Sequence, residues 1–178
     1  KKLYDYMGSY KKIYNIERKE LESCGLLKES EILFFEERKS YMDSVRRQLE
    51  QLEKKGIRFI AHFDPDYPKR LLSIYGYPMG LCVNGQLPEE EKPAVAIIGA
   101  RNCTNYGRQM AQSLARELSA AGISIISGLA YGIDGAGHEG ALEAGQETYG
   151  VLGCGINVCY PKENYGLFSK MIKCGGIL

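Results

Sequence analysis

The chain has no long apolar run and almost no net charge. None of its 178 residues lie in a stretch that approaches the roughly eighteen apolar residues a membrane-spanning helix needs. The charged N-terminus shows no signal-peptide core. These absences indicate no membrane partner and predict a cytoplasmic protein. Because the net charge is only +1, the chain also lacks a global positive field, so any DNA binding must come from local groups.

Ligands for a metal ion are scarce as well. The sequence has two histidines and six cysteines, and no two cysteines form a C-x-x-C pair. Structural zinc sites use four such ligands at close spacing, so we expect no metal. Several cysteines stand beside apolar strand residues, where a free thiol behaves as a small hydrophobic group. We interpret the cysteines as reduced and structural.

Charge and glycine divide the chain into two parts. Most charged residues precede Pro93 and most glycines follow it, and the polar run PEEEKP at residues 88–93 is typical of a connector. In the first part, apolar residues spaced by three and four predict one helix over residues 30–55, which Gly56 ends. Residues 4–27 are more broken and predict two short helices, the second capped by Gly25. Shorter elements follow. We expect strands at residues 57–60 and 80–85, which could extend the main sheet, and a short helix at 67–74.

In the second part, three apolar runs each end on glycine. They are VAIIG at residues 95–99, ISIISG at 123–128 and TYGVLG at 148–153. Continuous apolar runs of this length predict short, wholly buried parallel strands. The helices predicted between and after them cover residues 106–121, 133–144 and 164–173. A further strand begins at residues 175–178, so we expect that the C-terminal part of this α/β core is missing from the chain.

The carboxyl ends of these strands predict a phosphate-binding edge. Such ends meet at one side of a parallel sheet, where backbone N–H groups and helix N-termini attract anions. The candidate residues at this edge are Gly99, Ala100, Arg101, Ser127, Gly128, Gly153, Gly155 and Lys162. Arg101 is placed for bidentate phosphate contact. Lys162 lies near a helix N-terminus, which is unfavourable for a cation and suggests an external ligand.

Simpler interpretations of these residues remain open. Arg101 and Lys162 could be ordinary solvated side chains, and Ser127 with Gly128 could form a tight strand-to-helix turn. His138 beside Glu139 could be an acid–base pair. However, no nucleophile of matching spacing accompanies it, so we expect a packed, hydrogen-bonded histidine and no catalytic residue. A G-x-G-x-x-G fingerprint and an acidic residue after the second strand are both missing, so we expect no dinucleotide cofactor.

The glycine-rich segments, read together, resemble the DNA-processing protein A (DprA, or Smf) family. The matching runs are VAIIGARNCTNYG, ISIISGLAYGIDGAGHEGAL and GVLGCGINVCYPKENYGLF, preceded by DPDYPKRLLSIYGYPMGLCVNG. The resemblance covers residues 57–178 and implies an extended Rossmann-like DNA-binding domain, truncated at its C-terminus. Its sheet would be mostly parallel, with helices on both faces. Residues 1–56 are similar to the family's small N-terminal helical region, which resembles a sterile-alpha-motif domain, and we expect that the opening helices of that region are missing here.

The resemblance also implies a function. Family members bind single-stranded DNA without catalysing a reaction, protect incoming strands during natural transformation and load the RecA recombinase. The full-length protein would be a homodimer. The family's Gly-Ser-Arg motif falls on Gly99-Ala100-Arg101, which gives Arg101 the DNA-phosphate role, although Ala100 lacks the usual serine hydroxyl. Lys162 matches a basic DNA-contacting position, and Gly137 stands where alanine is common.

The alternative is a nucleotide-processing enzyme on a related Rossmann-like fold, similar to phosphoribohydrolases or lysine-decarboxylase-like proteins. Those proteins carry a Pro-Gly-Gly-x-Gly-Thr motif followed by a glutamate, and nothing in this sequence matches it. A purely structural interaction domain is the third possibility, and the glycine-lined edge of the sheet argues against it. Single-stranded DNA binding is therefore the function that the sequence predicts.

Overall fold

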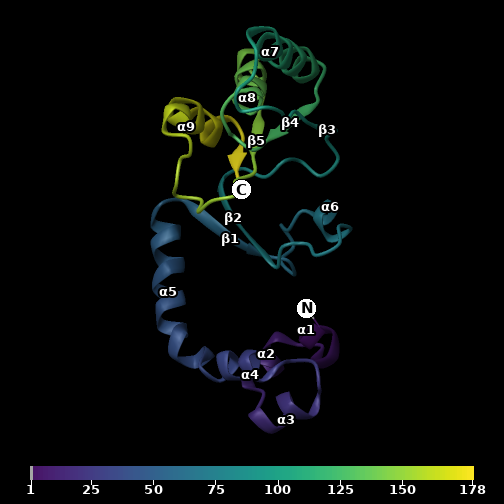
Figure 1. Cartoon of the computed structure of the whole chain (residues 1–178), viewed down its shortest axis with the longest axis vertical. Coiled ribbons are helices and arrows are strands. Elements are labelled where there is room, and N and C mark those ends of the chain that lie inside the picture. The colour runs from purple at the N-terminus through teal and green to yellow at the C-terminus, as the bar shows by residue number, and fades with distance from the viewer. Residues whose placement is uncertain (1) are drawn as a thin grey trace. The chain divides into compact units, whose positions relative to one another are not determined.

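A computed structural model describes residues 2–178 and divides the chain into two compact units (Figure 1). The first unit ends at Gln51 and the second covers Leu52–Leu178, so the division falls within helix α5 (Arg38–Lys54). The first unit is helical throughout, whereas the second contains all the strands of the described chain.

The helical unit is built around a small apolar cluster. Its other helices are α1 (Lys2–Met7), α2 (Tyr10–Asn15), α3 (Arg18–Ser23) and α4 (Glu29–Glu36). Leu3, Ile16, Leu21 and Ile32 are buried against one another and form its core. The region predicted to hold two short helices therefore holds three. Gly25 has a positive φ of 63° just after α3, in agreement with the stop predicted there.

The single helix predicted over residues 30–55 is wrong, because α4 and α5 are separated at Glu37. Arg38 explains the break. Its guanidinium donates hydrogen bonds to the carbonyl oxygens of Tyr14 (2.7 Å), Ile16 (2.7 Å) and Phe35 (2.6 Å). These bonds fix the start of α5 on the α2 end of the unit while the end of α4 packs into the core. Tyr14 and Ile16 are more than twenty residues from Arg38, so the local spacing of apolar residues could not predict this break.

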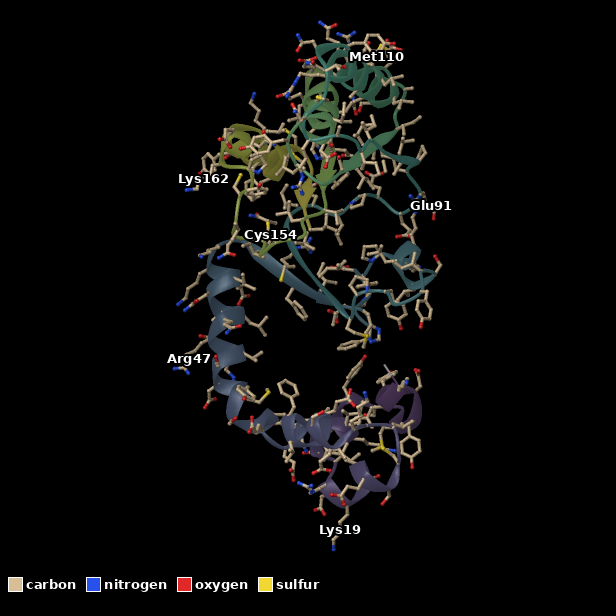
Figure 2. All side chains as sticks on the ribbon, viewed as in Figure 1. Lys19, Arg47, Glu91, Met110, Cys154 and Lys162 are labelled. Carbon is tan, nitrogen blue, oxygen red and sulfur yellow. The ribbon has the colours of Figure 1, made fainter. Side chains whose placement is uncertain are left out.

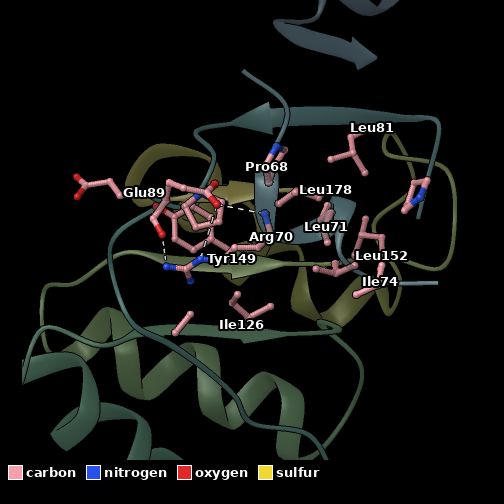
Figure 3. A pocket seen from close by; sticks show the side chains of 15 residues that line it. Pro68, Arg70, Leu71, Ile74, Leu81, Glu89, Ile126, Tyr149, Leu152 and Leu178 are labelled. Atoms are coloured by element: carbon pink, nitrogen blue, oxygen red, sulfur yellow. Dashed lines mark hydrogen bonds and ion pairs between the residues drawn. The ribbon is translucent and has the colours of Figure 1, made fainter. Parts of the chain in front are cut away.

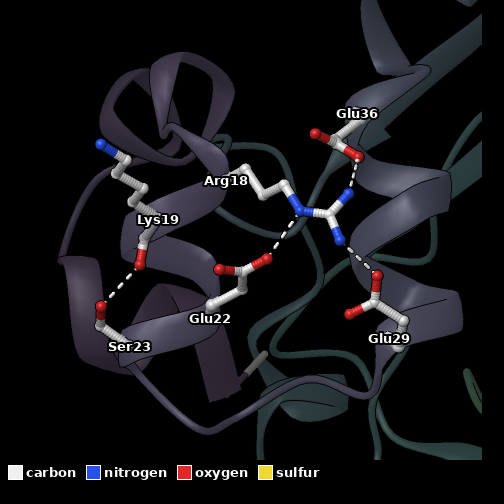
Figure 4. A network of polar contacts seen from close by, with 6 residues as sticks. All are labelled: Arg18, Lys19, Glu22, Ser23, Glu29 and Glu36. Carbon is white, nitrogen blue, oxygen red and sulfur yellow. Dashed lines mark hydrogen bonds and ion pairs between the residues drawn. The ribbon is translucent and has the colours of Figure 1, made fainter.

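Arg18 connects α3 to α4 through a network of ion pairs (Figure 4). Its guanidinium donates to Glu22 at 2.6 Å, to Glu36 at 2.8 Å and to Glu29. These hydrogen bonds raise the pKa of Arg18 above its usual value. All four side chains are solvent-exposed, so each pair adds little stability, and the network acts mainly to orient the two helices.

The second unit is built on a six-stranded sheet with the order β1-β2-β6-β5-β4-β3. The strands are β1 (Ile57–Ala61), β2 (Gly80–Gly85), β3 (Ala94–Ala96), β4 (Ser124–Ser127), β5 (Thr148–Gly150) and β6 (Gly176–Ile177). Strands β3, β4, β5 and β6 are parallel neighbours, whereas β1 and β2 join through antiparallel pairs. The two early strands do extend the main sheet, and the prediction of a mostly parallel α/β fold is confirmed.

Helices cover the two faces of this sheet unequally. Helices α7 (Asn105–Ala120), α8 (Ile133–Glu143) and α9 (Tyr165–Cys174) match the predicted ranges within one residue. They pack on one face, where Ile125 of β4 contacts buried alanines of α7 and α8. On the other face lies α6 (Lys69–Leu72), which is two residues shorter than the predicted helix at each end. Pro68 explains the later start, because the residue before a proline is disfavoured in helical conformation.

An apolar pocket of about 470 Å³ lies between the α6 segment and this second face (Figure 3). Ile126 and Tyr149 form its floor from neighbouring strands, and Leu71 and Leu178 line it. Arg70 donates a hydrogen bond to the Lys92 carbonyl oxygen at 3.0 Å and thereby ties α6 to the connector. The connector itself has no helix or strand.

Two of the three predicted core strands are shorter and more exposed than expected. The strand predicted over residues 148–153 ends at Gly150 in β5, and Val151 is 52% exposed. Residues 95–99 are predicted to be buried, yet β3 ends at Ala96 and the side chain of Ile98 is 72% exposed. The reason is that β3 is an edge strand of the sheet and pairs only with β4. By contrast, Ile125 in β4 is fully buried.

His138 is a packed core residue, as the sequence predicts. It is fully buried on α8, and its Nδ1 lies 2.7 Å from Thr148 Oγ1. The threonine hydroxyl donates to the Ile125 carbonyl oxygen at 2.8 Å, so the histidine Nδ1 must be the donor to the hydroxyl. Burial lowers the pKa of His138 to about 3, which keeps the imidazole neutral.

Low pH should destabilise the second unit through His138. The pKa of an unfolded histidine is about 6.5, so between pH 6.5 and 3 the unfolded chain binds more protons than the folded one. The free energy of unfolding should therefore fall as pH falls through that window. Urea unfolding at several pH values should show a flatter dependence for His138→Gln. An unchanged dependence would contradict the assignment, since other titrating groups are common to both proteins.

Close packing of α7 on α8 generates a second prediction. A Cβ added at Gly140 would lie 3.0 Å from Ala115 Cβ and would overlap the Gln112 carbonyl group. Gly140→Ala should therefore cost roughly 1–3 kcal/mol of stability. The matched control is Gly166→Ala on α9, where a Cβ would meet nothing within 4 Å. Alanine there should be neutral or stabilising, and equal melting temperatures for the two variants would contradict this account.

Candidate functional site

Three loops leave the carboxyl ends of the adjacent strands β3, β4 and β5. The first carries Gly99, Ala100 and Arg101, the second runs from Gly128 to Gly132, and the third carries Gly153 and Gly155 before reaching Lys162. Because β3, β4 and β5 are parallel neighbours, these loops lie along one edge of the sheet. The predicted site residues therefore come from one edge of the fold.

Gly132 is where the first two loops touch. Its φ of 78° favours glycine, and a Cβ there would lie 2.6 Å from the Arg101 carbonyl oxygen and closer still to that of Ala100. The next residue, Ile133, donates its N–H to the Ala100 carbonyl oxygen at 3.3 Å. The backbone that carries Arg101 is thus held against the start of α8.

Asp134 supports the same arrangement from inside. It is buried in the first turn of α8, where the helix dipole favours a carboxylate. The N–H of Gly99 points to its Oδ1 at 3.4 Å, and a Cβ at Gly128 would lie only 2.8 Å from its Oδ2. The sequence marks Asp134 as a helix-start residue but contains no signal that it joins two glycine loops.

Asn164 connects the second loop to the third. Its amide donates to the carbonyl oxygens of Leu129 (3.0 Å) and Ala130 (3.3 Å). Leu129 is fully buried with a φ of 58°, an uncommon conformation for a residue other than glycine. Asn164 belongs to the short 3-10 helix η1 (Lys162–Asn164), so these bonds also fix the backbone of Lys162. Sequence reasoning missed this residue, because its partners are more than thirty residues away.

Arg101 and Lys162 both point away from the core. Each is exposed, and within residues 2–178 neither forms an ion pair. Figure 2 shows the Lys162 side chain extending outward from the ribbon. The neighbouring carboxylate of Glu163 accepts a hydrogen bond from the Tyr131 hydroxyl, which lowers the pKa of Glu163. The charge of Lys162 also lowers the pKa of Glu163, but in the described residues no ion pair holds Lys162 or Arg101, so both side chains can contact an external anion.

Ser127 has a different environment from the one its position suggests. It is buried at the end of β4, and its hydroxyl donates to the Ile97 carbonyl oxygen at 2.5 Å. This bond continues the β3–β4 pairing beyond the last strand residue, so the hydroxyl faces the protein rather than solvent. Gly153 and Gly155 are exposed in the third loop, and a Cβ at Gly153 would meet nothing within 4 Å. Close packing therefore does not explain Gly153.

Metal ligands, thiols and apolar helices are the other features of the described residues that could indicate a function. Across residues 2–178, no three His, Cys, Asp or Glu side chains are grouped as metal ligands. The described cysteines are all free thiols. His138 is buried between α8 and the sheet, against Thr148 of β5. In the same range, no helix combines the length and the apolar character needed to cross a membrane.

Sequence comparison identifies relatives for the region that contains the edge. The family model for DNA recombination-mediator protein A matches residues 58–178. Protein Smf of Synechocystis is 36% identical over 134 residues, which are 73% of this chain and 34% of the relative. DNA processing protein DprA of Bacillus subtilis is 38% identical over 128 residues, 71% of this chain and 43% of the relative. The chain thus spans less than half the length of these relatives.

Solved structures agree with this result. The X-ray structure of DprA from Streptococcus pneumoniae superposes with a TM-score of 0.73 at 29% identity, over 91% of this chain and 55% of that one. A structure of the Helicobacter pylori protein, described by its single-stranded DNA binding mode, gives 0.60 at 30% identity over 68% and 54% of the two chains. Fold, sequence and glycine loops lead to one conclusion: the chain belongs to the DNA recombination-mediator protein A family.

Proposed function

We propose that this protein binds single-stranded DNA through its phosphate backbone at the carboxyl edge of β3, β4 and β5. The observation that carries the proposal is the pair Arg101 and Lys162, two exposed cations without ion-pair partners in residues 2–178, on loops whose backbones are fixed. The single-stranded DNA binding named for the Helicobacter pylori relative supports it.

The chemistry of the edge suits phosphate. Arg101 offers a planar guanidinium that can donate two parallel hydrogen bonds to one phosphate, and Lys162 offers a compact positive charge. Ala100 has no hydroxyl, so additional donors must come from backbone N–H groups of the loops. Contacts of these kinds position a strand without reading its sequence. We therefore expect binding with little sequence preference, and no bond-breaking chemistry.

The family resemblance supports a wider proposal for the full-length protein. It would protect incoming single strands during natural transformation and load the RecA recombinase onto them, acting as a homodimer in the cytoplasm. Protection of a strand would rest on DNA contacts such as those proposed for this edge. The other activities need contacts to partner proteins in addition to those to DNA.

Charge reversal tests the proposed site. Arg101→Glu and Lys162→Glu should each weaken binding to a fluorescent oligo(dT) by a few kcal/mol, because a repulsion replaces an attraction at a phosphate. Each lost phosphate contact should also lower the salt dependence by roughly 0.7 counterions. Arg116→Glu, an exposed residue of α7 far along the helix from the edge, makes the same charge change and should bind as the parent does.

The melting temperatures of all three variants should stay close to that of the parent, because exposed substitutions usually change stability by less than about 0.5 kcal/mol. Parent-like affinity in both Arg101→Glu and Lys162→Glu would show that DNA binds elsewhere. Equal losses in the Arg116→Glu control would show that only net charge matters.

The contact at Gly132 generates a further prediction. Gly132→Ala would force the Ala100–Arg101 backbone away from α8, so DNA affinity should fall severalfold and stability should drop by roughly 1–3 kcal/mol. Fluorescence anisotropy and thermal melting measure the two effects on the same sample. Gly166→Ala is again the control and should leave DNA affinity unchanged, with no loss of stability. A Gly132→Ala protein with parent-like affinity would mean that the position of Arg101 does not depend on this contact.

A further inference from the structure

Two tyrosine rings meet beside the proposed phosphate-binding edge. Tyr131 comes from the loop after β4 and Tyr160 from the loop after β5, and their ring centroids lie 6.3 Å apart at an interplanar angle of 78°. The two residues are 38% and 52% exposed, respectively. They are thus a surface pair, although aromatic rings in contact usually serve a core.

The pair is held in place by polar contacts. The Tyr131 hydroxyl donates to the Glu163 carboxylate, and this bond raises the pKa of Tyr131. The amide of Asn164 holds the carbonyl oxygen of Ala130, the residue before Tyr131. Tyr131 is therefore held at its hydroxyl and at its backbone, so a ligand that contacts the ring loses little binding free energy to ordering this side chain.

The position of the pair relates it to both cations. Tyr131 directly precedes Gly132, whose backbone touches the carbonyl groups of Ala100 and Arg101. Tyr160 stands two residues before Lys162. The aromatic pair consequently lies between the loop that carries Arg101 and the loop that carries Lys162.

We propose that Tyr131 and Tyr160 form a stacking platform for the unpaired bases of the bound strand. This inference rests on the proposed function and assigns the base-contacting part of the same site. In a T-shaped pair the edge of one ring meets the face of the other, so the pair itself leaves the faces of the edge-on ring uncovered. Every base has a π-face, so stacking of this kind tolerates any sequence.

The platform also accounts for a preference between single and double strands. Bases in a duplex are already stacked on their neighbours and cannot lie on a protein ring without unpairing. The Tyr131 hydroxyl donates its hydrogen to Glu163, so it cannot also donate to an acceptor on a base edge. Discrimination would therefore come from stacking rather than from reading of donor and acceptor patterns.

An abasic oligonucleotide tests the platform, because it keeps the phosphates and removes the bases. Fluorescence anisotropy would compare oligo(dT) with a tetrahydrofuran abasic strand of equal length, using the full chain. We expect the parent to bind oligo(dT) about tenfold more tightly than the abasic strand. Tyr160→Leu and Tyr131→Leu should remove most of that difference and leave abasic binding unchanged. Tyr131→Phe, which keeps the ring, should retain most of it.

Tyr75→Leu is the matched control, since Tyr75 is a fully exposed tyrosine of the α6 segment, and it should behave as the parent does. Equal parent affinity for the two strands, with both lost in Arg101→Glu, would overturn the stacking platform and keep the phosphate site. An equal loss for both strands in Tyr160→Leu would also overturn it. Absence of binding to either strand would overturn the proposed function together with the platform.

Discussion

The close approach of two backbones at Gly132 is the constraint on which the site depends. Only a residue without a side chain lets the start of α8 lie against the carbonyl groups of Ala100 and Arg101. That approach fixes the loop after β3 to the loop after β4, and Asn164 then fixes the loop after β4 to η1. Three short loops thus become one rigid edge. Rigidity matters for binding a flexible strand, because only the ligand then loses conformational freedom.

Local sequence patterns predict most of the secondary structure of this chain but only part of its site. The apolar runs that end on glycine predict the positions of β4 and β5, since buried parallel strands need no other signal, although β5 ends at Gly150 rather than at Gly153. The 3.6-residue period predicts α7 and α8 to within one residue. The break at Glu37 was missed, because its cause is a guanidinium that reaches carbonyl groups on α2. Local patterns do not carry such partners.

The candidate site divides in the same way. Arg101 and Lys162 lie on the segments that follow β3 and β5, so topology alone predicts that both are at the carboxyl edge, and both are exposed. Their contact with DNA remains a prediction. The Ser127 hydroxyl is equally suited to bind phosphate, yet it donates to the Ile97 carbonyl oxygen. Ile97 is the first residue after β3, so this partner depends on where β3 ends. Asp134 and Asn164 carry no motif of their own, and only the folded chain shows which loops they join.

The brevity of β3 has a consequence for self-association. A strand at the edge of a sheet exposes unpaired N–H and C=O groups, and apolar side chains beside them invite strand addition by another molecule. At the β3 side of the sheet, Val95 is exposed and Ile98, just after the strand, is more exposed still. Ordered strand geometry nevertheless ends after three residues, between Pro93 and Gly99. So short a template offers an incoming strand few hydrogen bonds, which protects this apolar edge from sheet-to-sheet aggregation.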